Sequence, residues 1–200
     1  MSNMEGKIMD DIIIKKFSPE LLDDYLFFFD NIGFSDHEDW SWCYCTAYHF
    51  DDEMGKRLDH SAKTGMRNTA ILLIKNKIIN GYLAYQNDNV VGWCNVNKKN
   101  NFIRIINRKE LCEDMDEEIK SIVCFLIAPN MRGKGIATKI LMEICEDSKN
   151  DGTKYIESYP FKNGKNSFEE YHGPVKLYQN MGFIKYKELE NEIIMRKEIK

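Results

Sequence analysis

The strongest chemical signal in this sequence is a glycine-containing loop that follows an apolar run. Residues 132–138 read Arg-Gly-Lys-Gly-Ile-Ala-Thr, and Pro129 separates them from the apolar run Ile122–Ala128. A loop between a buried strand and a helix presents the unpaired N–H groups of the first helical turn, with roughly half a positive charge. Glycines let an anion approach that backbone, and Arg132 and Lys134 add positive charge. The spacing therefore predicts a phosphate-binding loop.

The loop does not match the fingerprints of the common nucleotide-binding loops. The pattern G-x-x-x-x-G-K-[ST] is absent, and G-x-G-x-x-G would require a glycine at Thr138. An ordinary turn between a strand and a helix, with no ligand, can have the same sequence pattern. The loop alone therefore leaves its ligand open.

Two segments in the same order and at the expected separation resemble the GNAT-type N-acetyltransferase superfamily. Arg132, Gly135 and Ala137 match its signature [RQ]-x-x-G-x-[GA], and residues 177–183, Leu-Tyr-Gln-Asn-Met-Gly-Phe, resemble its L-Y-x-x-x-G-F segment. The similarity covers approximately residues 71–197. Two ordered motifs are much more specific than either one alone.

The resemblance implies transfer of an acetyl group from acetyl-CoA to a primary amine, preferentially of a small molecule and alternatively of a peptide, by direct attack. The strand backbone would pair with the pantetheine arm and stabilise the developing oxyanion, while the loop N–H groups hold the pyrophosphate. The residues so assigned are Phe125, Leu126, Ile127, Arg132, Gly133, Lys134, Gly135, Ile136, Ala137 and Thr138. The alternative is a non-catalytic acyl-CoA-binding module that uses the same loop.

Three side chains are candidates for proton transfer. Tyr178 matches the usual general acid of the family, which protonates the departing CoA thiolate. Glu157 and His172 are both candidates for the general base, since either could take a proton from an ammonium directly or through water. Each of the three also has a purely structural interpretation. The sequence departs from many relatives at Tyr171, where they place an asparagine on the pantetheine side.

Aromatic and acidic side chains gather in the irregular segment Ser35–Gly65. In this superfamily the corresponding segment usually shapes the acceptor site, so we expect a pocket wall here. Its aromatic members are Trp40, Trp42, Tyr44 and Tyr48, and its neighbouring acids are Asp36, Glu38, Asp39, Asp51, Asp52 and Glu53. Aromatic faces beside carboxylates suit a cationic amine. The alternative is a solvated acidic surface above an aromatic core.

The same segment contains thiols and an imidazole that invite a metal interpretation. Cys43, Cys45 and His49 could supply ligands, but structural zinc normally takes four, commonly with a C-x₂₋₄-C pair. The spacing here is C-x-C and no fourth ligand is obvious nearby. We therefore expect no metal.

Hydrophobic periodicity predicts the elements that must position these residues. Ser18, Pro19 and Glu20 are typical of a helix start, with a capping hydroxyl, a proline in the first turn and an acid at the positive end of the dipole. Gly33 ends this helix. The predicted strands are 11–17, 81–86, 90–96, 122–128, 154–159 and two within 183–197, and the further helices are 66–77, 135–151 and 174–181. Residues 97–118 are expected to form a loop with one or two helical turns.

The predicted fold is a single α/β domain over residues 1–200, with a mixed, mostly antiparallel twisted sheet of about seven strands flanked by helices. The chain has 43% hydrophobic and 30% charged residues. Because its net charge is −4, nucleic acid is not expected as a partner. No apolar run approaches the roughly 18–20 residues of a membrane span, and no secretory signal is evident. We therefore expect a cytoplasmic protein whose cysteines are reduced. The sequence does not decide whether the protein forms a homodimer.

Overall fold

A single seven-stranded sheet with the order β1-β2-β3-β4-β5-β7-β6 forms the frame of the computed structural model. The structure describes residues 11–51, 53, 56, 63–112, 114, 115, 118–162 and 171–200. The β4–β5 pairing is parallel and the other five pairings are antiparallel. The strands are β1 (Ile12–Lys16), β2 (Gly81–Gln86), β3 (Asn89–Lys98), β4 (Ile119–Ile127), β5 (Tyr155–Ser158), β6 (Ile184–Glu188) and β7 (Ile193–Glu198). The predicted mixed sheet is confirmed.

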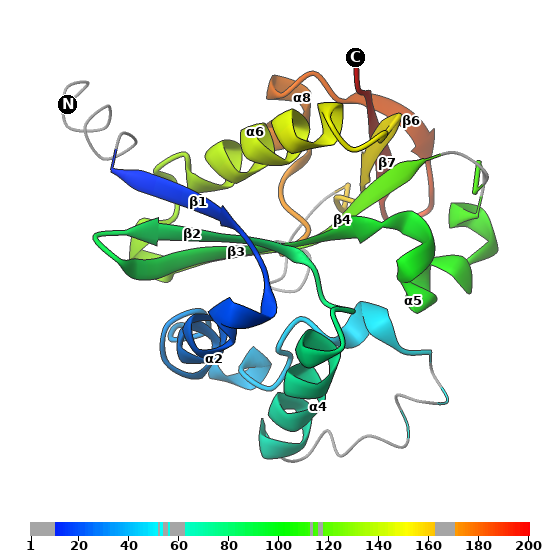
Figure 1. The fold of residues 1–200 in the computed structure, drawn as a ribbon. Coiled ribbons are helices and arrows are strands. Elements are labelled where there is room, and N and C mark those ends of the chain that lie inside the picture. The colour runs from blue at the N-terminus through cyan, green and yellow to red at the C-terminus, as the bar shows by residue number, and fades with distance from the viewer. Residues whose placement is uncertain are drawn as a thin grey trace.

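Helices cover both faces of this sheet (Figure 1). The α6 and α8 helices lie on one face, and α2 and α4 lie on the other. The α-helices are α2 (Leu22–Asn31), α4 (Lys63–Lys75), α5 (Ile103–Ile106), α6 (Ile136–Lys149) and α8 (Val175–Asn180). Short 3₁₀ turns are η1 (Pro19–Leu21), η2 (Glu38–Trp40), η3 (Ala47–His49), η4 (Lys99–Asn101), η5 (Lys109–Leu111) and η6 (Pro129–Met131). Within the described ranges, none of the helices combines the length and hydropathy that crossing a membrane would require.

An aromatic cluster fixes the α2 face of the sheet. The Trp93 ring on β3 contacts Tyr25 of α2 edge-on, with 4.9 Å between ring centroids, and Phe17 at 5.1 Å. On the opposite face, α6 packs one apolar side against the sheet. Its buried residues are Ile136, Ile140, Leu141, Ile144, Cys145 and Ser148.

Two glycines allow the elements around β4 to approach closely. A Cβ atom at Gly33, just after α2, would lie 2.6 Å from Leu126 Cδ2. A Cβ atom at Gly92 on β3 would lie 2.8 Å from Ile127 Cδ1 and 3.3 Å from Ile136 Cγ2. Gly33 therefore allows close packing against the end of β4, and Gly92 allows close packing against both the end of β4 and the start of α6.

Two details differ from the sequence prediction. Ser18 makes no side-chain capping bond, and the first turn is 3₁₀ before α2 begins. The Ser18 hydroxyl instead bonds the Glu20 carboxylate and lowers the pKa of that carboxyl. Residues 97–118 contain more structure than a loop, because β3 continues to Lys98 and three short helices follow.

The β4 strand separates from β5 partway along its length. Register pairs run from Ile119 with Tyr155 to Ile122 with Ser158, whereas the antiparallel pairing with β3 continues to Ile127. From Val123 onward, the β5-facing edge of β4 is therefore available to other groups. This separation positions the candidate site.

Candidate functional site

The predicted strand–loop–helix junction is confirmed by the backbone geometry. After β4 and η6, Gly133 and Gly135 adopt left-handed φ angles of +73° and +79°. Gly135 is the residue before α6 and no side chain caps it. Past the loop, Lys139 N–H donates to the Gly135 carbonyl at 3.0 Å. The N–H groups of the first helical turn, from Ile136 to Thr138, therefore have no intrahelical partner.

The loop leaves room for an anion beside these N–H groups. A Cβ atom at Gly133 would meet nothing within 4 Å, and Arg132, Gly133 and Lys134 are exposed. Positive backbone dipoles, an exposed lysine and open space are the properties that a pyrophosphate-binding turn requires.

Arg132 joins the loop to the segment expected to form the acceptor wall. Its Nε donates to the Ile127 carbonyl at 3.2 Å, and its Nη1 and Nη2 contact the Asp36 carboxylate at 2.5 and 3.2 Å. Burial alone would raise the pKa of Asp36, but the hydrogen bonds and charge of Arg132 lower it below its ordinary value. The positions of Asp36 and Arg132 in the sequence do not predict this contact, so it emerges only from the structure.

Two cavities flank Tyr171. The first, of about 160 Å³, lies beside the loop and is lined by Phe125, Ile127, Arg132, Ala137 and Leu177 among others. The second, of about 50 Å³, has Trp40, Cys43, Cys45, Tyr48, Cys124 and His172 among its lining residues. Tyr171 lines both cavities, so this residue separates them.

The open edge of β4 carries a hydrogen bond from outside the sheet. Phe125 N–H donates to the Tyr171 carbonyl at 2.6 Å. The Tyr171 hydroxyl is buried without a hydrogen-bond partner among the described residues, and burial raises its pKa to about 12. Tyr171, the position at which the sequence departs from its relatives, thus lies against the strand that is predicted to bind pantetheine.

Tyr178 is fully buried behind the same segment. Its ring packs near Phe125 and Phe183, with centroids 6.4 and 5.5 Å away, and its hydroxyl donates to the His172 carbonyl at 2.6 Å. Burial raises the pKa of Tyr178 well above its ordinary value, so the phenol keeps its proton near neutral pH. The predicted acid and the predicted cosubstrate strand are therefore neighbours.

His172 is a neutral side chain at the second cavity. Burial, assisted by the positive charges of Arg108 and Arg104, lowers its pKa to about 4. Its Nε2 lies 3.5 Å from the Tyr48 hydroxyl, and its ring packs edge-on against Phe161 with 5.1 Å between centroids. The described geometry therefore brings His172 together with the segment expected to form the acceptor wall.

Glu157 lies in a buried ionic network away from both cavities flanking Tyr171. Arg196 donates to Glu157 Oε1 through Nε at 2.9 Å and Nη2 at 2.5 Å. Lys99 Nζ and the Tyr159 hydroxyl contact Glu157 Oε2 at 2.9 and 3.0 Å. Both carboxylate oxygens are thus engaged by hydrogen-bond donors and cations, and we propose a structural role instead of the base role considered from the sequence.

Replacing Glu157 with glutamine is expected to lower the free energy of unfolding by about 3 kcal/mol, because two buried cations lose their shared counter-charge. Urea denaturation measures this loss, and kcat of the folded enzyme is expected to stay within about threefold. Glu118→Gln is the control, because Glu118 pairs with Lys98 at 2.9 Å with both side chains 57% exposed. That control should change stability by less than about 1 kcal/mol. A large fall in kcat with stability intact would return Glu157 to the general-base role.

The four aromatic residues of the expected pocket wall separate into two groups. Trp40 and Tyr48 line the second cavity, and Trp42 stacks on Trp40 with 6.2 Å between centroids. Tyr44 does not line it. Its hydroxyl donates to Asp30 and its ring stacks on Phe29 at 5.7 Å, so it is a core residue that supports the wall from behind.

None of the described carboxylates of this segment lines the second cavity. Asp36 pairs with Arg132, and Glu38 lines a different, more polar hollow near Asp30. Asp52, another acid of this segment, lies outside the described residues. Of the residues expected to form the acceptor wall, Trp40 and Tyr48 therefore line this cavity, whereas the described acids do not.

The Cys45 thiol and the His49 imidazole contact the same side-chain amide, that of Asn95. Asn95 Nδ2 lies 3.1 Å from the Cys45 carbonyl, 3.3 Å from Cys45 Sγ and 3.3 Å from His49 Nε2. Within the described ranges, no three His, Cys, Asp or Glu side chains are arranged to hold a metal ion. All six cysteines, which lie in those ranges, are free thiols.

Comparison with known proteins agrees with this geometry. The model of the acetyltransferase (GNAT) family matches residues 34–183. No curated protein sequence matches the chain significantly.

Several solved structures share the fold at low sequence identity. PaiA N-acetyltransferase from Thermoplasma acidophilum, in complex with coenzyme A, is 17% identical with a TM-score of 0.53, and the match covers 94% of this chain and 98% of that one. YncA from Salmonella typhimurium, with acetyl-CoA, is 11% identical with a TM-score of 0.52 and 95% of each chain covered. A GNAT-family acetyltransferase from Listeria monocytogenes is 9% identical with a TM-score of 0.58 and 94% of each chain covered. At such identities the likeness concerns the fold.

Proposed function

Because this chain belongs to the GNAT acetyltransferase family, we propose that it transfers the acetyl group of acetyl-CoA to a primary amine of a small molecule by direct attack. The observation that carries the proposal is the junction of β4 and α6. Two left-handed glycines there present unpaired N–H groups beside an open edge of β4. This combination of an anion-binding turn with a strand edge that β5 leaves unpaired suits a molecule that has a pyrophosphate and an extended amide arm.

The residues present fit acetyl-CoA, which supplies an activated acyl group as a thioester. The N–H groups from Gly133 to Thr138 would hold the pyrophosphate, with Lys134 adding charge. The backbone of Phe125–Ile127 would pair with the pantetheine arm and donate to the thioester oxygen. Support comes from PaiA and YncA, whose structures contain coenzyme A and acetyl-CoA respectively.

Tyr178 is proposed as the general acid. Its raised pKa keeps the phenol protonated, and it lies next to Phe125, where the thioester would sit. Its proton points to the His172 carbonyl, so the segment from Tyr171 to Gly173 must shift before the hydroxyl can reach a departing thiolate. His172, neutral and at the second cavity, is preferred over Glu157 for accepting a proton from the acceptor amine or for orienting a water that does so.

We also propose that residues 1–200 act as one domain, with Ser35–Gly65 as the acceptor segment. The contact between Asp36 and Arg132 supports this arrangement, because it joins that segment to the cosubstrate loop. A reducing, cytoplasmic location is part of the proposal, and the six free thiols are consistent with it.

Binding and turnover measurements test the proposal together. Calorimetric titration with acetyl-CoA is expected to give a dissociation constant on the order of micromolar, and a thiol reagent should detect CoA release with a panel of primary amines. Binding without CoA release for any amine would favour the alternative, a non-catalytic acyl-CoA-binding module. Failure of acetyl-CoA to bind at all would exclude both functions.

A further inference from the structure

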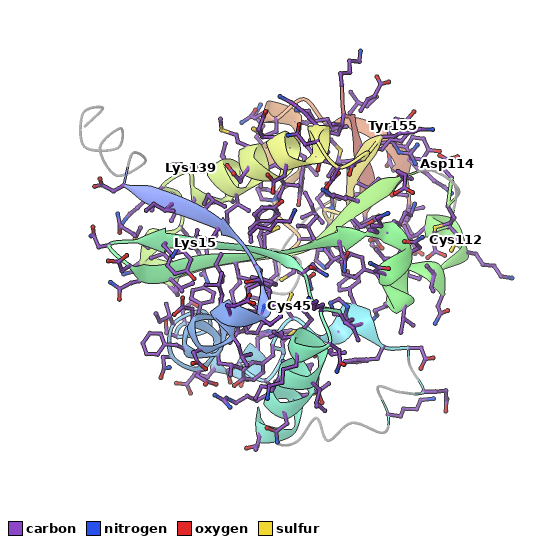
Figure 2. The ribbon with its side chains drawn as sticks, viewed as in Figure 1. Lys15, Cys45, Cys112, Asp114, Lys139 and Tyr155 are labelled. Carbon is purple, nitrogen blue, oxygen red and sulfur yellow. The ribbon has the colours of Figure 1, made fainter. Side chains whose placement is uncertain are left out.

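The two cavities beside Tyr171 lie on opposite faces of the sheet. Successive side chains of a strand alternate between its faces. Phe125 and Ile127 line the cavity at the phosphate loop, on the side covered by α6, whereas Cys124, the residue directly before Phe125, lines the smaller cavity. Figure 2 shows Cys45, another residue of the smaller cavity, between the sheet and the helices on the α2 side. A cosubstrate on one face would thus meet an acceptor that arrives from the other.

The smaller cavity is built from apolar and weakly polar side chains. Aromatic rings come from Phe29, Phe34, Trp40 and Tyr48, and the three thiols are those of Cys43, Cys45 and Cys124. None of the described lysine, arginine, aspartate or glutamate side chains lines it. A second ammonium group would therefore lose its hydration here without gaining a described counter-ion.

The charges that act on this cavity are also unfavourable to a cation. Its single imidazole, His172, is neutral at pH 7, and the positive charges of Arg108 and Arg104 help to lower its pKa to about 4. Glu192 is the nearby acid that acts on Tyr48, but it pairs with Arg108 at 2.6 Å. The nearby electrostatics thus add to the desolvation cost of a buried ammonium.

We infer that the cavity bounded by Trp40, Cys43, Tyr48 and Cys124 binds a compact apolar group of the acceptor, so that the preferred acceptor is a hydrophobic primary monoamine and not a diamine or polyamine. The inference rests on the proposed acetyl transfer and specifies its substrate class. It replaces the cationic acceptor expected from the aromatic and acidic composition of this segment. The apolar end of the acceptor would enter the cavity, leaving its amine toward the β4 edge at Phe125.

Two amines of equal heavy-atom count test the inference. Pentylamine and diaminobutane differ in whether the far end is a methyl group or an ammonium. Their kcat/KM values, measured as CoA release at pH values that match the free-amine concentrations, are expected to differ by roughly tenfold or more in favour of pentylamine.

Filling the cavity should remove this preference. Cys43→Leu enlarges a half-buried lining side chain, so the ratio of the two kcat/KM values is expected to fall toward one while acetyl-CoA binding persists. Cys112→Leu is the matched control, since Cys112 is also half-buried but lies near α5 and donates to the Ile106 carbonyl at 3.0 Å. This control should keep the wild-type ratio. If Cys43→Leu fails to fold, Ala47→Leu fills the same cavity.

The outcomes separate this inference from the proposed function. Equal or faster turnover of diaminobutane would overturn the apolar acceptor and leave acetyl transfer standing. If acetyl-CoA binds but neither amine reacts, tryptophan fluorescence with CoA present decides: tighter binding of pentylamine supports the inference, and equal or weaker binding overturns it. Absence of acetyl-CoA binding would overturn the proposed function and the inference with it.

Discussion

Replacing Gly133 with aspartate is expected to weaken acetyl-CoA binding by roughly 100-fold or more. The new carboxylate would lie in the open space beside the unpaired N–H groups, where the pyrophosphate is proposed to bind. Two unit charges about 4 Å apart repel by about 4 kcal/mol at an effective dielectric constant near 20, and about 1.4 kcal/mol corresponds to tenfold in affinity. Calorimetric titration of wild type and variant measures the difference.

Gly152→Asp is a closely matched control for this experiment. Gly152 has a φ of +80° against +73° for Gly133, and a Cβ atom at either position would meet nothing within 4 Å. Both substitutions therefore impose similar backbone strain and the same change of net charge. Gly152 follows the far end of α6, so its variant should retain wild-type affinity. Equal losses in both variants would show that strain or net charge, and not the loop, governs binding.

Replacing Tyr178 with phenylalanine is expected to lower kcat by about 10²–10⁴-fold while acetyl-CoA binding is retained. The substitution removes the proton proposed for the departing CoA thiolate and preserves the ring that packs near Phe125 and Phe183. It also leaves the buried His172 carbonyl without this donor, which costs about 1–3 kcal/mol of stability. Steady-state kinetics, with urea denaturation in parallel, separate the two effects.

Tyr25→Phe is the control, because it also removes a buried tyrosine hydroxyl that donates to a backbone carbonyl. Both tyrosines are fully buried, and each hydroxyl donates to a backbone carbonyl at 2.6 Å, that of Tyr44 for Tyr25 and that of His172 for Tyr178. The two variants should lose comparable stability, but Tyr25→Phe should keep kcat within about threefold. Comparable losses of kcat in both would assign Tyr178 a structural role.

The helices and strands of this fold were predictable because the apolar patterns in the sequence match the side chains that the structure buries. The apolar run before Pro129 became β4, and the periodic residues Ile136, Ile140 and Ile144 became the buried side of α6. The loop between them follows from glycines that adopt left-handed backbone angles, which few other residues tolerate. Boundaries were less predictable, as at Lys98, where pairing with β4 extends a strand beyond its apolar residues.

The candidate site was only partly predictable, because its contacts join residues far apart in the chain. The spacing between Asp36 and Arg132 carries no signal of their ion pair. The sequence leaves Glu157 a candidate base, whereas in the structure Lys99 and Arg196 contact its carboxylate oxygens. Tyr44 shares its residue type with Tyr48, yet Asp30 holds its hydroxyl in the core. The departure at Tyr171 was visible in the sequence, but not the bond between its carbonyl and Phe125.

That bond has a consequence for the solubility of the chain. A strand edge with unpaired N–H and C=O groups is a template on which a strand of another molecule can add, and such edges promote aggregation. The function proposed here requires an open edge on β4 beyond Ile122, where β5 no longer pairs with it. The Tyr171 carbonyl caps Phe125 on that edge. The segment from Tyr171 to Gly173 must move when the cosubstrate binds. Before binding, the same segment would hinder the addition of a strand from another molecule.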